Sequence, residues 1–208
     1  MRLTAEHITY HYPGSKRNIL SDVNISVEHT ERVGIMAASG IGKTTLCQIL
    51  AGYRTSGEGK VLLDGTPLPQ RGYCPVQMIW QHPEMAVNPR VKLREVLREG
   101  SHVEGRILRG LGIEEDWCGR YPSELSGGEL QRFCIARALG EGTRFLIADE
   151  ISTMLDLITQ SQIWNFLLGE LRERDIGLIM TSHDPQLMDM VCTRKIDLEK
   201  TAECFDQL

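Results

Sequence analysis

A short glycine-bearing segment carries residue types that bind phosphate groups. Residues 37–44 read Ala-Ala-Ser-Gly-Ile-Gly-Lys-Thr and stand between an expected strand, 32–36, and an expected helix, 44–50. Small residues and glycines leave backbone N–H groups free to point at an anion, and the following helix turns its positive N-terminal end toward it. In such a loop Lys43 reaches the β- and γ-phosphates of a nucleotide and Thr44 offers its hydroxyl to Mg²⁺. A chance glycine-rich turn is the alternative, which the strand–helix context disfavours.

Two acids follow an apolar strand farther along the chain. Residues 144–150 read Arg-Phe-Leu-Ile-Ala-Asp-Glu, which places two carboxylates at the C-terminal edge of a sheet, beside the phosphate loop. We expect Asp149 to hold the magnesium ion, through water, and Glu150 to orient and polarise an attacking water molecule. The alternative is that the strand simply ends at the protein surface, where the two acids are solvated. The presence of a phosphate loop in the same chain disfavours this alternative.

A third segment combines a helix cap with two glycines. Residues 125–132 read Leu-Ser-Gly-Gly-Glu-Leu-Gln-Arg, and Ser126 and Glu129 have capping-box spacing ahead of an apolar helix at 130–139. A helix start with free N–H groups and two glycines is also an anion site. Capping and phosphate contact can therefore hold together.

The segment 125–132 closely resembles the signature motif of ATP-binding cassette (ABC) ATPases, and further landmarks of that family occur in order over nearly the whole chain. The resemblance implies an α/β fold: a P-loop NTPase core of the ABC type with an N-terminal antiparallel β region and an inserted α-helical lobe. We expect one nucleotide-binding domain over 1–208, with the lobe at 83–140 carrying the signature motif.

The resemblance assigns roles to single residues. Tyr12 is the aromatic that stacks on adenine, Gln81 touches magnesium and the attacking water, and His183 contacts the γ-phosphate. With Lys43 and Glu150, Gln81 and His183 would form the catalytic group. A strand-end tyrosine and a structural histidine are the plain alternatives for Tyr12 and His183. The nucleotide contacts implied within the loop are Ser39, Gly40, Ile41, Gly42, Lys43, Thr44 and Thr45, and the implied magnesium ligands are Thr44, Gln81 and Asp149.

In ABC ATPases the signature motif of one subunit contacts the nucleotide that the opposite subunit holds. The resemblance therefore implies a head-to-tail dimer with two ATP sites at its interface, to which each chain contributes Ser126, Gly127 and Gly128, with Asp156 in the loop that communicates across the dimer. Three residues depart from the family pattern. Ala37 replaces the first glycine of the loop, and because alanine is the smallest replacement we expect a working loop. Ile151 replaces a proline and Met154 a small residue, and both bear on the geometry between subunits while removing no catalytic group.

The supporting elements alternate between strands and helices. We expect strands at 3–10, 19–27, 60–63, 145–148, 176–181 and 194–198, helices at 157–174 and 186–190, and mainly helix between 83 and 140. In the long helix Ile163, Leu167 and Leu171 recur at four-residue spacing, which is typical of a helix face packed on a core.

Composition bounds the function. The chain has 208 residues and a formal charge of −5, which argues against free-standing nucleic-acid binding. No apolar run approaches the roughly 20 residues of a membrane helix, and residues 1–6 show no signal-peptide core. The six cysteines lack CxxC spacing, so we expect structural thiols rather than a zinc site.

The segment after Gln81, residues 81–90, resembles that of peptide and nickel importers, and 155–163 points the same way. We therefore expect the ATP-hydrolysing subunit of an ABC importer of peptides or nickel, with ATP and Mg²⁺ as cofactors. Its implied partners are a second cassette, the same or different, integral permease subunits that dock after Gln81, and an extracytoplasmic substrate-binding protein. The location would be the cytoplasmic face of the cell membrane.

A soluble ABC ATPase of a non-transport machine, such as a phosphonate-degradation complex, is the main alternative. A degenerate cassette that binds ATP only for structural reasons is disfavoured by the presence of Lys43, Glu150 and His183.

Overall fold

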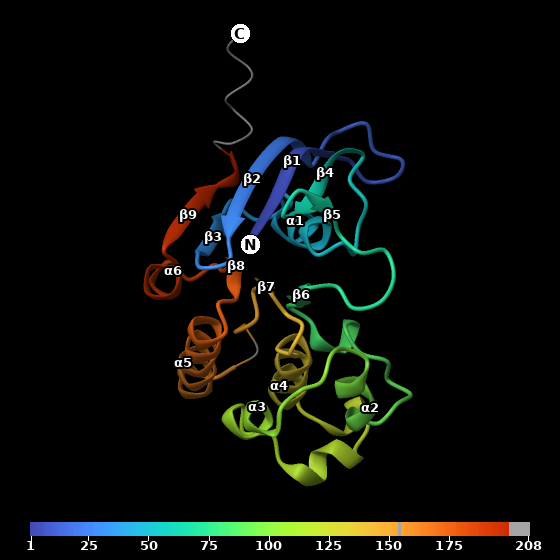
Figure 1. Cartoon of the computed structure of the whole chain (residues 1–208), viewed down its shortest axis with the longest axis vertical. Coiled ribbons are helices and arrows are strands. Elements are labelled where there is room, and N and C mark those ends of the chain that lie inside the picture. Colours follow the sequence, from blue (N-terminus) through green and yellow to red (C-terminus); the bar gives the residue numbers. More distant parts are fainter. Residues whose placement is uncertain (154, 200–208) are drawn as a thin grey trace.

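The computed structural model describes residues 1–153 and 155–199, which fold around two sheets (Figure 1). A four-stranded antiparallel sheet has the order β2-β1-β4-β5, and a five-stranded parallel sheet has the order β6-β7-β8-β3-β9. The strands of the first sheet are β1 (Arg2–Tyr10), β2 (Leu20–Glu28), β4 (Glu58–Leu63) and β5 (Thr66–Pro67). Those of the second are β3 (Arg32–Met36), β6 (Val76–Ile79), β7 (Phe145–Asp149), β8 (Gly177–Thr181) and β9 (Arg194–Asp197).

The central strands β7 and β8 of the parallel sheet are buried on both faces, and side chains of the sheet alternate between two cores. In β7, Phe145 and Ile147 join the core beneath the antiparallel sheet, whereas Leu146 and Ala148 join the core beneath the long helices. This period of two, with apolar residues on both faces, is what a central parallel strand requires.

Helices cover the two faces of the parallel sheet. The helix α1 (Lys43–Leu50) lies between the two sheets and buries Leu46 and Leu50 there. The helices α4 (Gly127–Ala138), α5 (Leu157–Glu173) and α6 (Pro185–Val191) supply side chains to the opposite core, among them Phe133, Leu167 and Leu187.

A helical lobe lies at the end of the molecule away from the antiparallel sheet (Figure 1). Within the predicted range 83–140 it contains α2 (Leu93–Arg98), α3 (Gly105–Gly110) and α4, together with the short 3₁₀ helices η1 (Pro83–Met85), η2 (Glu115–Gly119) and η3 (Pro122–Glu124). The helix α4 packs against α2 and η1, so the signature segment at its start is held by the lobe and by the sheet core together.

The predicted fold class is confirmed: an α/β core with an N-terminal antiparallel region and helices inserted between β6 and β7. The structure adds β6, which the sequence reading did not predict. The residues of β6 pair with β7 in parallel register, from Val76 opposite Phe145 to Ile79 opposite Ala148. Because this pairing partner lies almost 70 positions away, the short segment carries little local signal.

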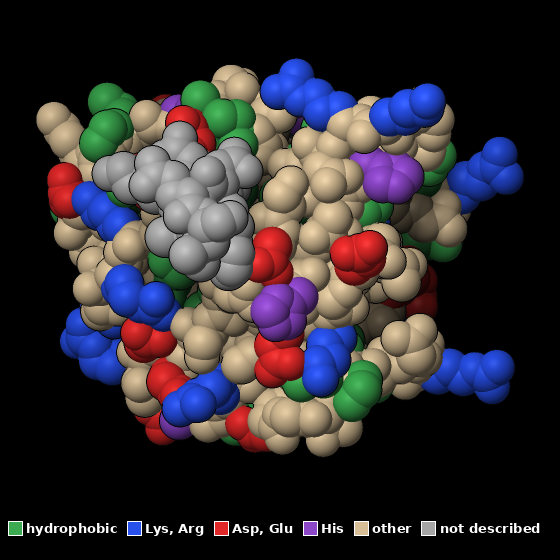
Figure 2. All heavy atoms as spheres, turned by 90° about the horizontal axis from the view of Figure 1, so that it is seen from above, with side chains coloured by type: hydrophobic (Ala, Val, Ile, Leu, Met, Phe, Trp, Pro, Cys, Tyr) green, Lys and Arg blue, Asp and Glu red, His purple; other side chains and the backbone are tan. Residues whose placement is uncertain are grey.

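Acidic and basic side chains are interspersed on the face seen from above the antiparallel sheet (Figure 2). Over the described part of this face, positive charge is therefore not gathered into one patch. Within residues 1–153 and 155–199, none of the helices is both long enough and apolar enough to span a bilayer.

Candidate functional site

The phosphate loop joins the end of β3 to α1, and its conformation depends on two glycines. Gly40 and Gly42 have φ of 83° and 94°, in the left-handed region that side chains disfavour. A Cβ at Gly42 would also lie 2.6 Å from Cγ2 of Ile19. The loop therefore keeps its shape only with glycine at these positions, as the sequence pattern predicts.

The side chain of Lys43 arches back over the loop. Its Nζ donates to the carbonyl oxygens of Ala37 at 3.0 Å and Ala38 at 3.2 Å, and the residue is buried. At the start of the loop the Ala38 N–H donates to Oε1 of Glu199 at 2.8 Å, a contact that the sequence did not indicate. The loop thus presents a lysine ammonium at the positive end of α1, which is an anion-binding arrangement.

A cavity of about 330 Å³ opens beside the loop. Ten of the residues that the sequence reading proposes for the site line it: Tyr12, Ser39, Gly40, Gly42, Lys43, Thr44, Thr45, Gln81, Glu150 and His183. Ile19 also lines it and was not foreseen, because an apolar residue beside a strand carries no chemical signal in the sequence. Ile41 and Asp149 do not line the cavity.

Glu150 lies between two polar side chains. Nε2 of Gln81 donates to its Oε2 at 2.9 Å, and Nε2 of His183 lies 2.8 Å from its Oε1. The three residues follow the ends of β6, β7 and β8, and parallel strands bring their carboxyl ends to one edge of a sheet. The backbone of Glu150 has φ of 50°, a strained value that is kept where the surroundings hold it.

Asp149 directly precedes Glu150 and is the last residue of the buried strand β7. Its side chain is 1% exposed, and Oδ1 accepts a hydrogen bond from the hydroxyl of Thr181 at 2.7 Å. The carboxylate of Asp149 does not itself line the cavity, which suits a role exerted through water.

Tyr12 borders the same cavity and is 41% exposed. Its hydroxyl hydrogen-bonds with Oγ1 of Thr45 at 2.7 Å, in the first turn of α1. The aromatic ring is therefore tied to the phosphate loop, and its stacking on adenine stays a prediction.

The signature residues lie elsewhere in the chain. A separate cavity of about 480 Å³ is lined by Ser126, Gly127, Gly128 and Asp156, together with Arg132 and Thr159. One chain therefore does not bring the signature segment onto its own phosphate loop.

Both helix starts at this second cavity are capped. Ser126 accepts from the Glu129 N–H at 3.3 Å, while Oε2 of Glu129 accepts from the Ser126 N–H at 2.7 Å, so the predicted capping box forms. The backbone and hydroxyl of Ser126 lower the pKa of Glu129. At α5 the hydrogen bonds from Thr159 lower the pKa of Asp156, which caps that helix. Both carboxylates thus stay ionised to a lower pH than usual.

Of the departures from the family pattern, Ile151 is described by the structure and Met154 is not. Ile151 is 3% exposed and fills the core beneath the long helices, so a hydrophobic side chain is accommodated there. Met154 lies outside the described residues.

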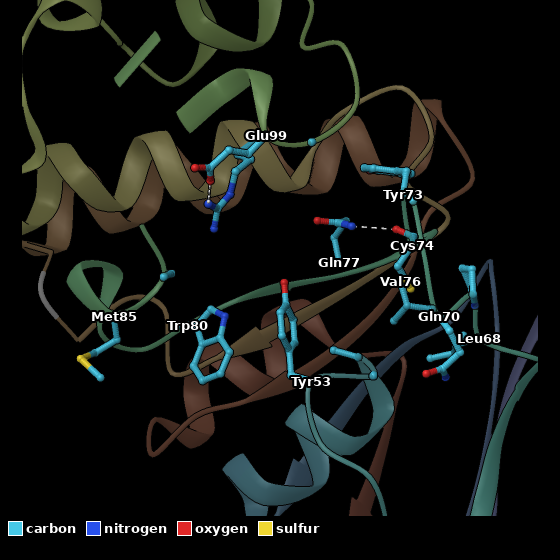
Figure 3. Close-up of a pocket in the computed structure, with 17 residues that line it drawn as sticks. Tyr53, Leu68, Gln70, Tyr73, Cys74, Val76, Gln77, Trp80, Met85 and Glu99 are labelled. Carbon is cyan, nitrogen blue, oxygen red and sulfur yellow. Dashed lines mark hydrogen bonds and ion pairs between the residues drawn. The ribbon is translucent and has the colours of Figure 1, made fainter. Parts of the chain in front are cut away.

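A cleft of about 820 Å³ is lined by residues on either side of β6, among them Tyr73, Trp80 and Met85 (Figure 3). Tyr53 and Trp80 meet edge to face with ring centroids 5.3 Å apart, and Trp80 stands between Tyr53 and Met85 in this view. On the lobe side, Nη1 of Arg137 pairs with Oε2 of Glu99 at 3.1 Å.

The wall of the cleft is connected to both nucleotide-associated segments. Nε2 of the buried Gln131, in α4, donates to the carbonyl oxygen of Trp80 at 3.2 Å. Gln81, the next residue, donates to Glu150. The backbone at Trp80 and Gln81 is therefore linked by hydrogen bonds both to Glu150 and to α4, the helix that begins at the signature segment.

Comparisons with known proteins agree with this geometry. The sequence matches the ABC transporter family over residues 20–153. It is 32% identical to the nickel import ATP-binding protein NikE of Rhodospirillum rubrum, over 88% of this chain and 73% of that protein. It is 31% identical to a probable peptide ABC transporter ATP-binding protein of Sinorhizobium fredii, over 91% of this chain and 62% of that protein.

Solved structures agree in fold. A dimeric, post-hydrolysis state of the ATP-binding cassette MJ0796 bound to ADP and Pi superimposes with a TM-score of 0.79 at 24% identity, covering 94% of this chain and 93% of that one. An ATP-binding subunit of an ABC transporter superimposes with a TM-score of 0.81 at 20% identity, covering 95% and 85%. From the family match and the relatives above 30% identity, we conclude that the chain belongs to the ABC transporter family, as one of its ATPase cassettes.

Proposed function

We propose that this chain is the ATP-binding and ATP-hydrolysing subunit of an ABC importer, with a peptide or nickel as the class of cargo. The observation that carries the proposal is the placement of Glu150 between Gln81 and His183, at a cavity that also contains Lys43 and Thr44. Such a cavity joins an anion-binding loop to a carboxylate base, which is what hydrolysis of the phosphoanhydride bond between the β- and γ-phosphates of ATP needs. The names of the relatives supply the importer and its cargo.

The residues around the cavity fit Mg²⁺. Thr44 offers a hydroxyl, Gln81 an amide oxygen and Asp149 a carboxylate, and magnesium prefers such oxygen ligands with several waters kept. Nε2 of Gln81 is used by Glu150, and its Oε1 has no partner among the described residues, so this oxygen is left to serve as a ligand. When bound, the ion would neutralise charge on the phosphates.

The chain's own groups divide the remaining work. Lys43 and the loop amides bind the phosphates, for which Lys43 exchanges its two carbonyl partners for phosphate oxygens. Oε2 of Glu150 accepts one hydrogen bond, from Gln81, and Oε1 lies 2.8 Å from Nε2 of His183, so lone pairs of the carboxylate remain for a further donor. Glu150 can therefore accept the hydrogen bond and then the proton of an attacking water while Gln81 and His183 hold it in place.

The second cavity supports a shared site in a dimer. Ser126, Gly127 and Gly128 present a capped helix start away from their own phosphate loop, and an anion from another molecule would fit there. We infer that this segment closes over the ATP of a second cassette, the same or different.

A dimer test follows from this inference. In the hydrolysis-deficient Glu150→Gln background, size-exclusion chromatography with Mg²⁺-ATP is expected to show a dimer, and adding Ser126→Arg is expected to remove it because the long cation blocks the helix start. Ser126→Thr is the matched control, since threonine keeps a capping hydroxyl. A dimer that persists with Ser126→Arg would contradict the shared site.

The 820 Å³ cleft is the surface that we assign to a permease subunit. It has aromatic walls, an exposed methionine, Met85 at 78% exposure, and the Arg137–Glu99 pair at its rim, features that suit a short docked segment of another protein. The position of the chain would then be the cytoplasmic face of the membrane, held there by permease subunits that also meet the substrate-binding protein.

Docking can be tested separately from nucleotide binding. We expect Glu84→Lys, or a bulky label at Met85, to uncouple transport while ATP affinity stays within about twofold, because neither side chain lines the nucleotide cavity. Glu58→Lys, on the exposed part of β4, is the matched charge reversal. Photo-crosslinkers between His82 and Arg90 should capture an integral membrane protein in native membranes. Capture of soluble proteins alone would favour the non-transport machine instead.

A further inference from the structure

Arg54 packs on the aromatic residue that borders the nucleotide cavity. Its guanidinium carbon lies 5.2 Å from the ring centroid of Tyr12 and 5.4 Å from that of Tyr10. These distances are within the range of cation–π attraction. Arg54 follows α1 by four residues and does not line the nucleotide cavity, so its effect on the cavity would have to pass through Tyr12.

The guanidinium is held by neutral groups. Nη1 donates to the hydroxyl of Tyr10 at 2.7 Å, and Nε donates to Oε1 of Gln48 at 2.8 Å. Among the described residues no carboxylate forms an ion pair with Arg54. Its position is thus set by two rings and two neutral acceptors, and its positive charge stays uncompensated at the edge of the site.

The ring of Tyr12 is fixed from several sides. Its hydroxyl meets Oγ1 of Thr45 at 2.7 Å, and its ring meets Tyr10 edge to face at 5.3 Å and 85°. The same ring is 41% exposed and borders the cavity of the phosphate loop. A ring that is clamped in this way and still partly accessible is prepared for stacking by a planar ligand, and preorganisation of this kind increases affinity by reducing the ordering cost of binding.

We propose that Arg54 is a positioning residue for the base of the bound nucleotide: it holds Tyr12 in the orientation in which the accessible part of the ring stacks on adenine. The inference rests on the proposed function, because it requires ATP to bind with its phosphates on the loop. It adds a residue that, through Tyr12, favours binding of the base and leaves binding of the phosphates unaffected.

The test compares ATP with inorganic triphosphate, which has the phosphates and no base. In calorimetric titrations with Mg²⁺, Arg54→Met keeps a side chain of similar length without the charge, and we expect its Kd for ATP to rise by about threefold to tenfold. Its Kd for triphosphate should stay within about twofold of the parent value. Arg54→Lys restores a cation over the ring and should recover most of the affinity for ATP. Arg71→Met is the matched control, since Arg71 is exposed before β6 and its side chain forms no hydrogen bond or ion pair with the described part of the chain.

A double-variant cycle shows whether Arg54 acts through Tyr12. In the Tyr12→Ala background, Arg54→Met should cause no further loss of ATP affinity. Gln48→Leu, which removes the acceptor of Nε, provides a second route and should weaken ATP over triphosphate in the same direction. Thermal unfolding shows whether Arg54→Met is folded. If it is not, the Kd values of Gln48→Leu for ATP and triphosphate test the proposal instead.

Three results would overturn the proposal: an unchanged Kd for ATP in Arg54→Met, equal weakening of ATP and triphosphate, or the same loss with and without Tyr12. All of them leave ATP binding by the parent chain intact. Failure of the proposed function would look different, because the parent chain itself would then bind no ATP.

Discussion

ATP hydrolysis by the Glu150→Gln variant is expected to fall by about two orders of magnitude or more, the usual size of a general-base contribution. The substitution keeps the shape of the side chain and removes the charge and most of the basicity from the group that would take the proton of the attacking water. The carboxylate is 10% exposed and contacted by Gln81 and His183, and among the described residues it is the one acid that lines the nucleotide cavity.

The variant separates hydrolysis from binding. Phosphate release at saturating Mg²⁺-ATP measures the loss, and calorimetry should show ATP affinity at least equal to that of the parent, because removing a negative charge from a phosphate site lowers repulsion. Glu141→Gln, on an exposed loop before β7, is the matched control. Turnover at the parent rate in Glu150→Gln would remove Glu150 from the proposed role.

The second large effect is expected on affinity. Lys43→Ala removes the only loop side chain that can place a positive charge on the β- and γ-phosphates among residues 37–44. A hydrogen bond to a charged group contributes about 1.5–3 kcal/mol, so the Kd for ATP should rise by roughly tenfold to a hundredfold or more.

Calorimetric titration with Mg²⁺-ATP measures this change, and Lys60→Ala is the matched control, since Lys60 pairs with Glu6 on the antiparallel sheet. Because Lys43 is buried, the unfolding temperature of the variant must be measured alongside. A folded variant whose affinity is unchanged would show that this loop is not the nucleotide site.

Features encoded within a few neighbouring residues could be predicted from the sequence. The phosphate loop depends on Gly40, Gly42 and Lys43 at fixed spacing, and the structure gives both glycines the positive φ that explains them. The capping box of Ser126 and Glu129 spans four residues and forms as predicted. In both cases the backbone geometry follows from the side chains of the segment itself.

Features that depend on distant pairing could not be predicted in the same way. The strand β6 exists because β7 pairs with it, and Ile19 borders the nucleotide cavity because the fold brings it against Gly42. Arg54 and Glu199 belong to no sequence motif. The contact of Arg54 with Tyr12 spans 42 positions, and the hydrogen bond between Ala38 and Glu199 spans 161. Side chains of this kind become candidates only when the tertiary contacts are known.

The roles assigned to the site residues therefore rest both on sequence motifs and on the structure. Their types and order came from motifs, whereas the grouping of Gln81, Glu150 and His183 at one sheet edge came from the structure. The effect of Ile151 on the geometry between subunits stays a prediction, since it concerns a second chain, and so does a working phosphate loop with Ala37. Met154 lies outside the described residues.

The central claim is that ATP binds on the phosphate loop beside Glu150 and is closed over by the signature segment of a second cassette. The most direct test is a crystal structure of Glu150→Gln grown with Mg²⁺-ATP. We predict a triphosphate held by the loop amides and Lys43, with its γ-phosphate near residue 150 and within hydrogen-bond reach of Ser126 from a second chain. A nucleotide bound away from Lys43, or one contacted by the signature segment of its own chain, would contradict the account.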